Sequence, residues 1–147
     1  MLVSLASPAQ AKGDGFILIT GPGLQQPIVL TAPADVAEVF WGGGLGERDR
    51  MERPGPRSSW GPRYQVLFVL WDTSTAPVTL RQDLYPFAAS GRFGMWTFTL
   101  PAQPWYGEHA TPGWWLLSGN AEGLLRQQGL PVAAGAEFSA YGRRRLG

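Results

Sequence analysis

Glycine and proline interrupt this chain so often that only short strands and short helices fit between them. The 147 residues include 20 glycines and 13 prolines, and both types favour turns over regular structure. Between them lie apolar or alternating runs of strand length. The chain is long enough for one domain with one core. We therefore expect a single, mainly β domain.

Several segments have the pattern of a β-strand. Residues 16–20 and 27–30 are apolar runs on either side of a Gly-Pro-Gly sequence, which predicts a hairpin. Residues 64–71 form a nearly continuous apolar run, which predicts a central strand with both faces buried. The other candidate strands are 78–85, 96–100 and 114–117.

Two short helices are expected among these strands. Residues 34–40 carry apolar side chains at helical spacing and are followed by three glycines. Ser118 stands in an N-cap position before a second helical segment, 121–128, which is followed by a glycine. The predicted fold class is mainly β, α+β at the margin: a small β-sandwich or partly open barrel with at least five strands and one or two short helices.

The two ends of the chain differ in composition from the part between them. Residues 1–11 hold an apolar run followed by Ala-Gln-Ala, the small-x-small pattern that signal peptidases accept. We interpret 1–11 as a truncated signal peptide and 12–131 as the single β-rich domain. Residues 132–147 are rich in Ala and Gly, contain three consecutive arginines, and are expected to form a flexible basic tail. This organisation predicts a secreted or cell-envelope protein.

Composition excludes several classes of function. The chain has no cysteine and one histidine, which removes disulfides, thiol nucleophiles and the usual zinc sites. The formal net charge is +1, so no global field attracts nucleic acid. No apolar run approaches the roughly 20 residues of a transmembrane helix. We predict no cofactor, no metal, no nucleic-acid partner and no transmembrane segment, and we leave the oligomeric state open.

Candidate catalytic groups lack the neighbours that catalysis needs. His109 follows Glu108, but no nucleophile motif accompanies them. Asp83 is expected on a sheet surface, paired with an arginine and too far from Asp72 for the paired carboxylates of a glycosidase. The acids within 47–52 alternate with arginines, which indicates a solvated mixed-charge loop rather than a cation site. We assign no catalytic residue and no metal ligand.

Tryptophan is the strongest positive signal. Seven tryptophans are present, and Trp71 and Trp96 follow strand patterns that predict burial in the core. Others lie in Gly/Pro-rich segments, where loops run over the surface and exposed rings can stack on sugars or peptides. The alternative is that these rings close the ends of the core. The candidate ligand-binding surface is built from 101–115 with Trp60 beside it. Its residues are Trp60, Trp105, Tyr106, His109 and Trp114.

Four phrases in a fixed order resemble a known group of proteins. They are ITGPGL with PI after it at 19–28, GPRY at 61–64, DLYPFA at 83–88 and GLP at 129–131. Together they are similar to an uncharacterised family of exported or membrane-associated bacterial proteins, common in actinobacteria and related groups. The resemblance covers about residues 16–131. It implies an envelope location and a small β-rich domain, and, because the family has no assigned activity, it carries over no site residue.

The sequence leads to one function and two alternatives. The leading prediction is a non-catalytic cell-envelope or extracellular module that binds a protein, peptide or glycan partner through its aromatic loops. The first alternative is a cell-wall polymer hydrolase that uses Glu108, His109 or Asp83. The second is a structural accessory domain of an envelope complex. A cleft with convergent titratable groups favours the hydrolase, an exposed aromatic patch favours binding, and buried tryptophans without a pocket favour the accessory domain.

Overall fold

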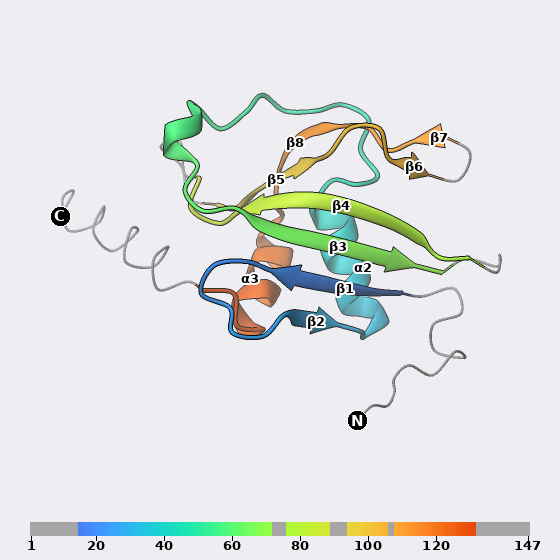
Figure 1. Cartoon of the computed structure of the whole chain (residues 1–147). Helices are drawn as coiled ribbons and strands as arrows, with labels where there is room; N and C mark the ends of the chain where they lie inside the picture. Colours follow the sequence, from blue (N-terminus) through green and yellow to red (C-terminus); the bar gives the residue numbers. More distant parts are fainter. Residues whose placement is uncertain (1–14, 72–75, 89–93, 106–107, 132–147) are drawn as a thin grey trace.

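The chain folds into one open antiparallel sheet with two helices on the same face (Figure 1). The computed structural model describes residues 15–71, 76–88, 94–105 and 108–131. The helices are α2 (Pro33–Gly42) and α3 (Gly119–Gln127), with a 3-10 turn η1 (Arg57–Ser59). The strands are β1 (Gly15–Thr20), β2 (Ile28–Leu30), β3 (Tyr64–Leu70), β4 (Val78–Tyr85), β5 (Trp96–Thr99), β6 (Pro104–Trp105), β7 (Glu108–His109) and β8 (Gly113–Leu116).

The main sheet has six strands in the order β2-β1-β3-β4-β5-β8, and β6 and β7 form a separate ribbon. Every neighbouring pair in the sheet is antiparallel. The predicted hairpin is present as β1 and β2, and the predicted central strand is β3, which lies inside the sheet. The prediction of a mainly β domain, α+β at its margin, is confirmed. The sheet is open, and the two helices form the second layer of the domain (Figure 1).

The main core lies between the sheet and the helices. Ile17, Phe68 and Leu80 are aligned across three neighbouring strands and are almost completely buried. Phe40 of α2 packs edge-on against Phe68, with ring centroids 5.9 Å apart, and Leu125 of α3 is buried in the same cluster. Because strand residues alternate between faces, this core uses only every second residue of each strand.

Polar side chains lie inside this core where the sequence pattern predicts none. Gln82, Thr97 and Thr99 are buried on the helix side of β4 and β5. The Gln82 amide donates to the Gly43 carbonyl and to the Thr99 hydroxyl, each at 2.9 Å, and the Thr97 hydroxyl donates to the same carbonyl at 3.0 Å. Gly43 directly follows α2, so these side chains satisfy a carbonyl that the end of a helix leaves unpaired.

The second helix begins as the sequence predicts. The Ser118 hydroxyl accepts a hydrogen bond from the Ala121 backbone N–H at 3.2 Å, which caps α3. Gly129 follows the helix with φ of 103°, in the region that favours glycine.

The expectation that β3 is buried on both faces is wrong. Gln65 is exposed and Leu67 is half-buried, because the helices cover only one face of the sheet. No helix within the described ranges is long and apolar enough to cross a bilayer. The predicted signal peptide, 1–11, and the predicted basic tail, 132–147, lie outside the described residues.

Candidate binding surface

The sheet face opposite the helices carries one row of side chains that crosses five strands. The register aligns Thr20, Gln65, Asp83, Phe98 and Trp114 on β1, β3, β4, β5 and β8. Aligned residues point to the same face, and neighbouring strands are 4.7–4.9 Å apart, so this cross-strand row is about 19 Å long. Its first members can form hydrogen bonds, and its last two are aromatic rings. The row therefore combines two kinds of contact on one surface.

An aromatic cluster surrounds the ring end of the cross-strand row. The Trp114 ring centroid lies 4.6 Å from that of Trp60, 5.0 Å from Phe98 and 5.4 Å from Tyr85. Trp60 and Tyr85 are 8% and 5% exposed, and Trp96 is also buried in this cluster. Phe98 and Trp114 are only half-buried. Part of each of these two rings therefore remains available at the surface.

The loop after α2 holds Trp60 against the sheet. The Met51 backbone N–H donates to the Trp114 carbonyl at 3.1 Å, which ties the start of this stretch to β8. The Trp60 indole donates to the Gly55 carbonyl at 3.0 Å, and the Arg57 guanidinium lies 5.4 Å from the Trp60 ring centroid. The segment 43–63, between α2 and β3, thus contains little regular structure but has defined contacts with the sheet.

Asp83 is the charged member of the cross-strand row. It is 8% exposed, and its carboxylate lies 4.0 Å from the Arg63 guanidinium. This contact confirms the predicted arginine pairing but is long for a hydrogen bond. Burial raises the pKa of Asp83, whereas the charges of Arg63 and Arg57 oppose that rise.

The two charges that shift the pKa of Asp83 both belong to arginines. Among the described residues, no second carboxylate contributes to this shift. A glycosidase needs two carboxylates about 5–9 Å apart. Within the described residues, no carboxylate is therefore seen to act as the partner on which paired-acid hydrolysis depends. Asp72, the other acid considered from the sequence, lies outside the described residues.

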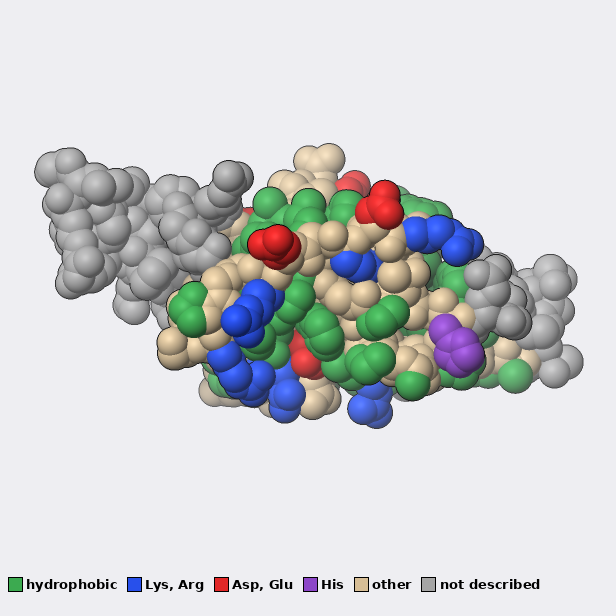
Figure 2. Space-filling model, turned by 90° about the horizontal axis from the view of Figure 1, so that it is seen from above, with side chains coloured by type: hydrophobic (Ala, Val, Ile, Leu, Met, Phe, Trp, Pro, Cys, Tyr) green, Lys and Arg blue, Asp and Glu red, His purple; other side chains and the backbone are tan. Residues whose placement is uncertain are grey.

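Exposed arginines border the row. Arg63 precedes β3, Arg57 lies in η1, and Arg81 lies two residues before Asp83 on the same face of β4. Figure 2 shows Arg side chains along the lower edge of the molecule with recessed acidic atoms beside them, hydrophobic side chains across the middle, and exposed acidic side chains in the upper part. The surface is therefore cationic around a mostly buried carboxylate.

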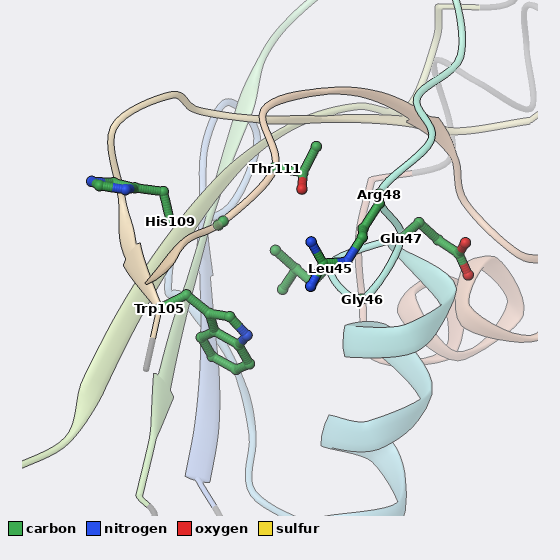
Figure 3. A pocket seen from close by; sticks show the side chains of 8 residues that line it. Leu45, Gly46, Glu47, Arg48, Trp105, His109 and Thr111 are labelled. Carbon is green, nitrogen blue, oxygen red and sulfur yellow. The ribbon is translucent and has the colours of Figure 1, made fainter. Parts of the chain in front are cut away.

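A small pocket lies at the other end of the predicted binding segment, where the β6–β7 ribbon meets the loop after α2 (Figure 3). Its volume is about 60 Å³, which is room for a few water molecules or one small chemical group rather than for a whole substrate. The lining residues are Leu45, Gly46, Glu47, Arg48, Trp105, His109, Ala110 and Thr111.

The titratable side chains of this pocket do not converge. Figure 3 shows the Glu47 carboxylate pointing away from Trp105, and the His109 ring pointing away from Arg48 and Thr111. His109 is exposed, while Trp105 is half-buried and packs on Phe40, with ring centroids 5.6 Å apart. The pocket therefore does not supply a cooperating acid and base.

The candidate residues chosen from the sequence fall into two groups. Trp60 and Trp114 meet in the aromatic cluster, whereas Trp105 and His109 line the small pocket. Tyr106 lies outside the described residues, as does the side chain of Glu108.

Sequence reasoning missed Gln65 and Phe98 as members of a binding surface. Each lies on a different strand from Asp83, and they become neighbours only through the register of β3, β4 and β5. The alternation of 78–85 does place Asp83 on the face opposite Leu80 and Leu84, and this signal could have pointed to the row.

Within the described ranges, no group of three or more His, Cys, Asp or Glu side chains could hold a metal ion. No family model matches the chain, and no match was found among curated proteins or solved structures. The family resemblance carried by the four sequence phrases therefore stays a prediction.

Proposed function

We propose that this chain is a non-catalytic binding module that binds its partner on the helix-free face of the sheet. The observation that carries the proposal is the cross-strand row, which joins hydrogen-bonding side chains to two half-exposed aromatic rings. Aromatic and arginine side chains are the commonest anchors of recognition surfaces. Both kinds are present here on a rigid sheet rather than on a loose loop.

The same geometry supports binding over the two alternatives. A hydrolase is less well supported because Asp83 is surrounded by arginines and the Glu47 and His109 side chains point apart. A purely structural domain is less well supported because Phe98 and Trp114 retain exposed area. The pattern of residues 1–11 and the family resemblance support a location outside the cytoplasm, in the cell envelope.

The proposal is tested with three fractions from the host envelope: wall polysaccharide, wall peptides and detergent-extracted proteins. Each is titrated into the full chain, and saturable binding is measured. We expect one fraction to bind, and Phe98→Leu to weaken that binding by about tenfold, which corresponds to about 1.4 kcal/mol.

Phe16→Leu is the matched control. Phe16 is also a half-buried ring on the helix-free face, but it pairs with Val69 and packs against Trp71, outside the row. Its substitution should leave binding unchanged. Failure of all three fractions to bind, or equal effects of the two substitutions, would contradict the proposed function.

A further inference from the structure

Resting on the proposed function, we propose that the cross-strand row binds an extended glycan that carries carboxylate groups. The row supplies ring faces at one end, hydrogen-bonding side chains in the middle and exposed arginines along its border. These are the three kinds of contact that an acidic sugar chain offers.

The ring end fits the apolar faces of sugar rings. A pyranose presents C–H groups on its two faces and hydroxyl groups around its edge. Phe98 and Trp114 are adjacent across β5 and β8, and both are half-buried. Trp114 packs against Trp60 and Tyr85, and Phe98 packs against Trp114. These contacts hold the two rings in place, so binding costs little side-chain entropy.

The polar end fits sugar hydroxyl groups. The exposed Gln65 amide can both donate and accept, and the Asp83 carboxylate accepts. No hydrogen-bond donor from the described residues reaches this carboxylate, whose nearest partner is the Arg63 guanidinium at 4.0 Å. A hydroxyl group donating to Asp83 would form a charge-assisted hydrogen bond, which is stronger than a neutral one.

The excess of positive charge beside the cross-strand row favours binding of an acidic glycan over a neutral one. Arg57, Arg63 and Arg81 are exposed around the Asp83 carboxylate. Asp83 offsets one of these charges, which leaves the border of the row cationic. Carboxylates on the ligand would complement that border, because arginine recognises carboxylates through paired donors.

A peptide strand is disfavoured by the direction of the row. Peptides that join a sheet bind at an edge, where backbone groups are unpaired. The cross-strand row instead runs over β3, β4 and β5, whose backbone groups are paired with neighbouring strands on both sides. Recognition here must therefore use side chains.

The test is a calorimetric titration of the full chain with trigalacturonate, a carboxylate-bearing trisaccharide, and with neutral maltotriose as the comparison. We expect saturable binding of trigalacturonate and at least about tenfold weaker binding of maltotriose. Phe98→Leu and Gln65→Ala should each weaken trigalacturonate binding by about fivefold to tenfold. Because Gln65 is exposed, its substitution tests the row without risk to the core.

The charge contribution is tested with a matched pair of arginines. Arg81→Gln removes a cation beside the row, and Arg126→Gln removes an exposed cation from α3 on the opposite side of the sheet. The inference predicts weaker binding and a smaller salt dependence for Arg81→Gln alone. Equal losses in both variants would show unspecific attraction and overturn the inference.

Two further outcomes would also overturn the inference, and they separate it from the proposed function. If maltotriose binds as tightly as trigalacturonate, the ligand is not selected by its carboxylates. If neither sugar binds but an envelope peptide or protein does, with sensitivity to Phe98→Leu, the surface is a binding site for a different class of partner. If nothing binds that responds to Phe98→Leu, the proposed function fails as well.

Discussion

The two faces of the sheet differ in how deeply their side chains are buried and in the kinds of side chain they carry. The helix-covered face is lined by aliphatic and phenyl side chains with almost no exposure, and its few polar groups bond to one another and to the end of α2. The helix-free face carries half-buried rings, a recessed carboxylate and exposed arginines, and a loop covers only part of it. One face thus supplies most of the stability, while the other keeps side chains available for recognition.

The largest contrast between the faces is expected from two phenylalanines. Phe68→Ala empties a site with no exposure on the helix-covered face and should lower the free energy of unfolding by about 3–5 kcal/mol. Phe98→Ala removes a ring on the helix-free face that is only half-buried and should cost less, about 1–2 kcal/mol. Urea unfolding of both variants measures the difference. Equal losses of unfolding free energy would mean that the helix-free face contributes as much to stability as the helix-covered face.

The polar network beneath α2 gives the next largest effect. Gln82→Leu removes donors to the Gly43 carbonyl and the Thr99 hydroxyl and should cost about 1–3 kcal/mol, because the buried partners lose a hydrogen bond. Gln65→Leu is the control, because Gln65 is exposed on the helix-free face, where it is aligned with Asp83 of β4. A Gln82→Leu protein as stable as the wild type would show that this network contributes nothing.

The cap of α3 tests how firmly the helical layer is attached. Ser118→Ala removes the hydrogen bond to the Ala121 N–H and should cost about 1 kcal/mol in thermal or urea unfolding. Ser59→Ala, in the exposed turn η1, breaks only a local bond to the Pro56 carbonyl and should have little effect. A larger loss of stability for Ser59→Ala than for Ser118→Ala would contradict the conclusion that the helices form the stabilising layer.

The smallest effect concerns Asp83 and depends on pH. Because burial raises the pKa of Asp83 in the folded chain, its ionisation disfavours folding. Its destabilising contribution is absent at pH values below the unfolded pKa of about 3.9. It grows as the pH rises through the folded pKa.

Asp83→Asn should therefore raise stability relative to the wild type at neutral pH, and this difference should shrink as the solution is acidified. Urea unfolding at pH 7 and pH 3.5 provides the comparison. A variant that is less stable than the wild type at pH 7 would show that the ion pair with Arg63 outweighs the cost of burial.

Much of the fold was predictable from local sequence. Gly/Pro boundaries, side-chain alternation and the apolar run of 64–71 predicted the six strands of the main sheet, and Ser118 predicted the start of α3. The short β6–β7 ribbon was not predicted. The second layer was not predictable from local sequence. That layer consists of two short helices of 10 and 9 residues, far apart in the sequence. Neither segment alone indicates that both helices pack on the same face of the sheet.

The candidate site was predictable only in part, for a physical reason. Aromatic content pointed to Trp60 and Trp114, which do meet. Long-range register brings Gln65, Asp83 and Phe98 into one row, and register depends on the assembled sheet rather than on any single segment. The same limit explains Thr97, whose polar side chain faces the core to reach the end of α2.

Two adjacent tryptophans on β8 report separately on the two faces of the sheet, and they show which face binds a partner. Trp114 belongs to the cross-strand row, whereas Trp115 is aligned with Thr97 on the helix side of the sheet and lies against Gly44. The chain is labelled with fluorotryptophan, and fluorine NMR follows both resonances while solubilised wall polysaccharide is added. Because the partner is expected on the helix-free face, the Trp114 signal should shift saturably while the Trp115 signal stays unchanged. A shift of Trp115 alone, equal shifts of both signals, or no shift with any envelope fraction would contradict this prediction.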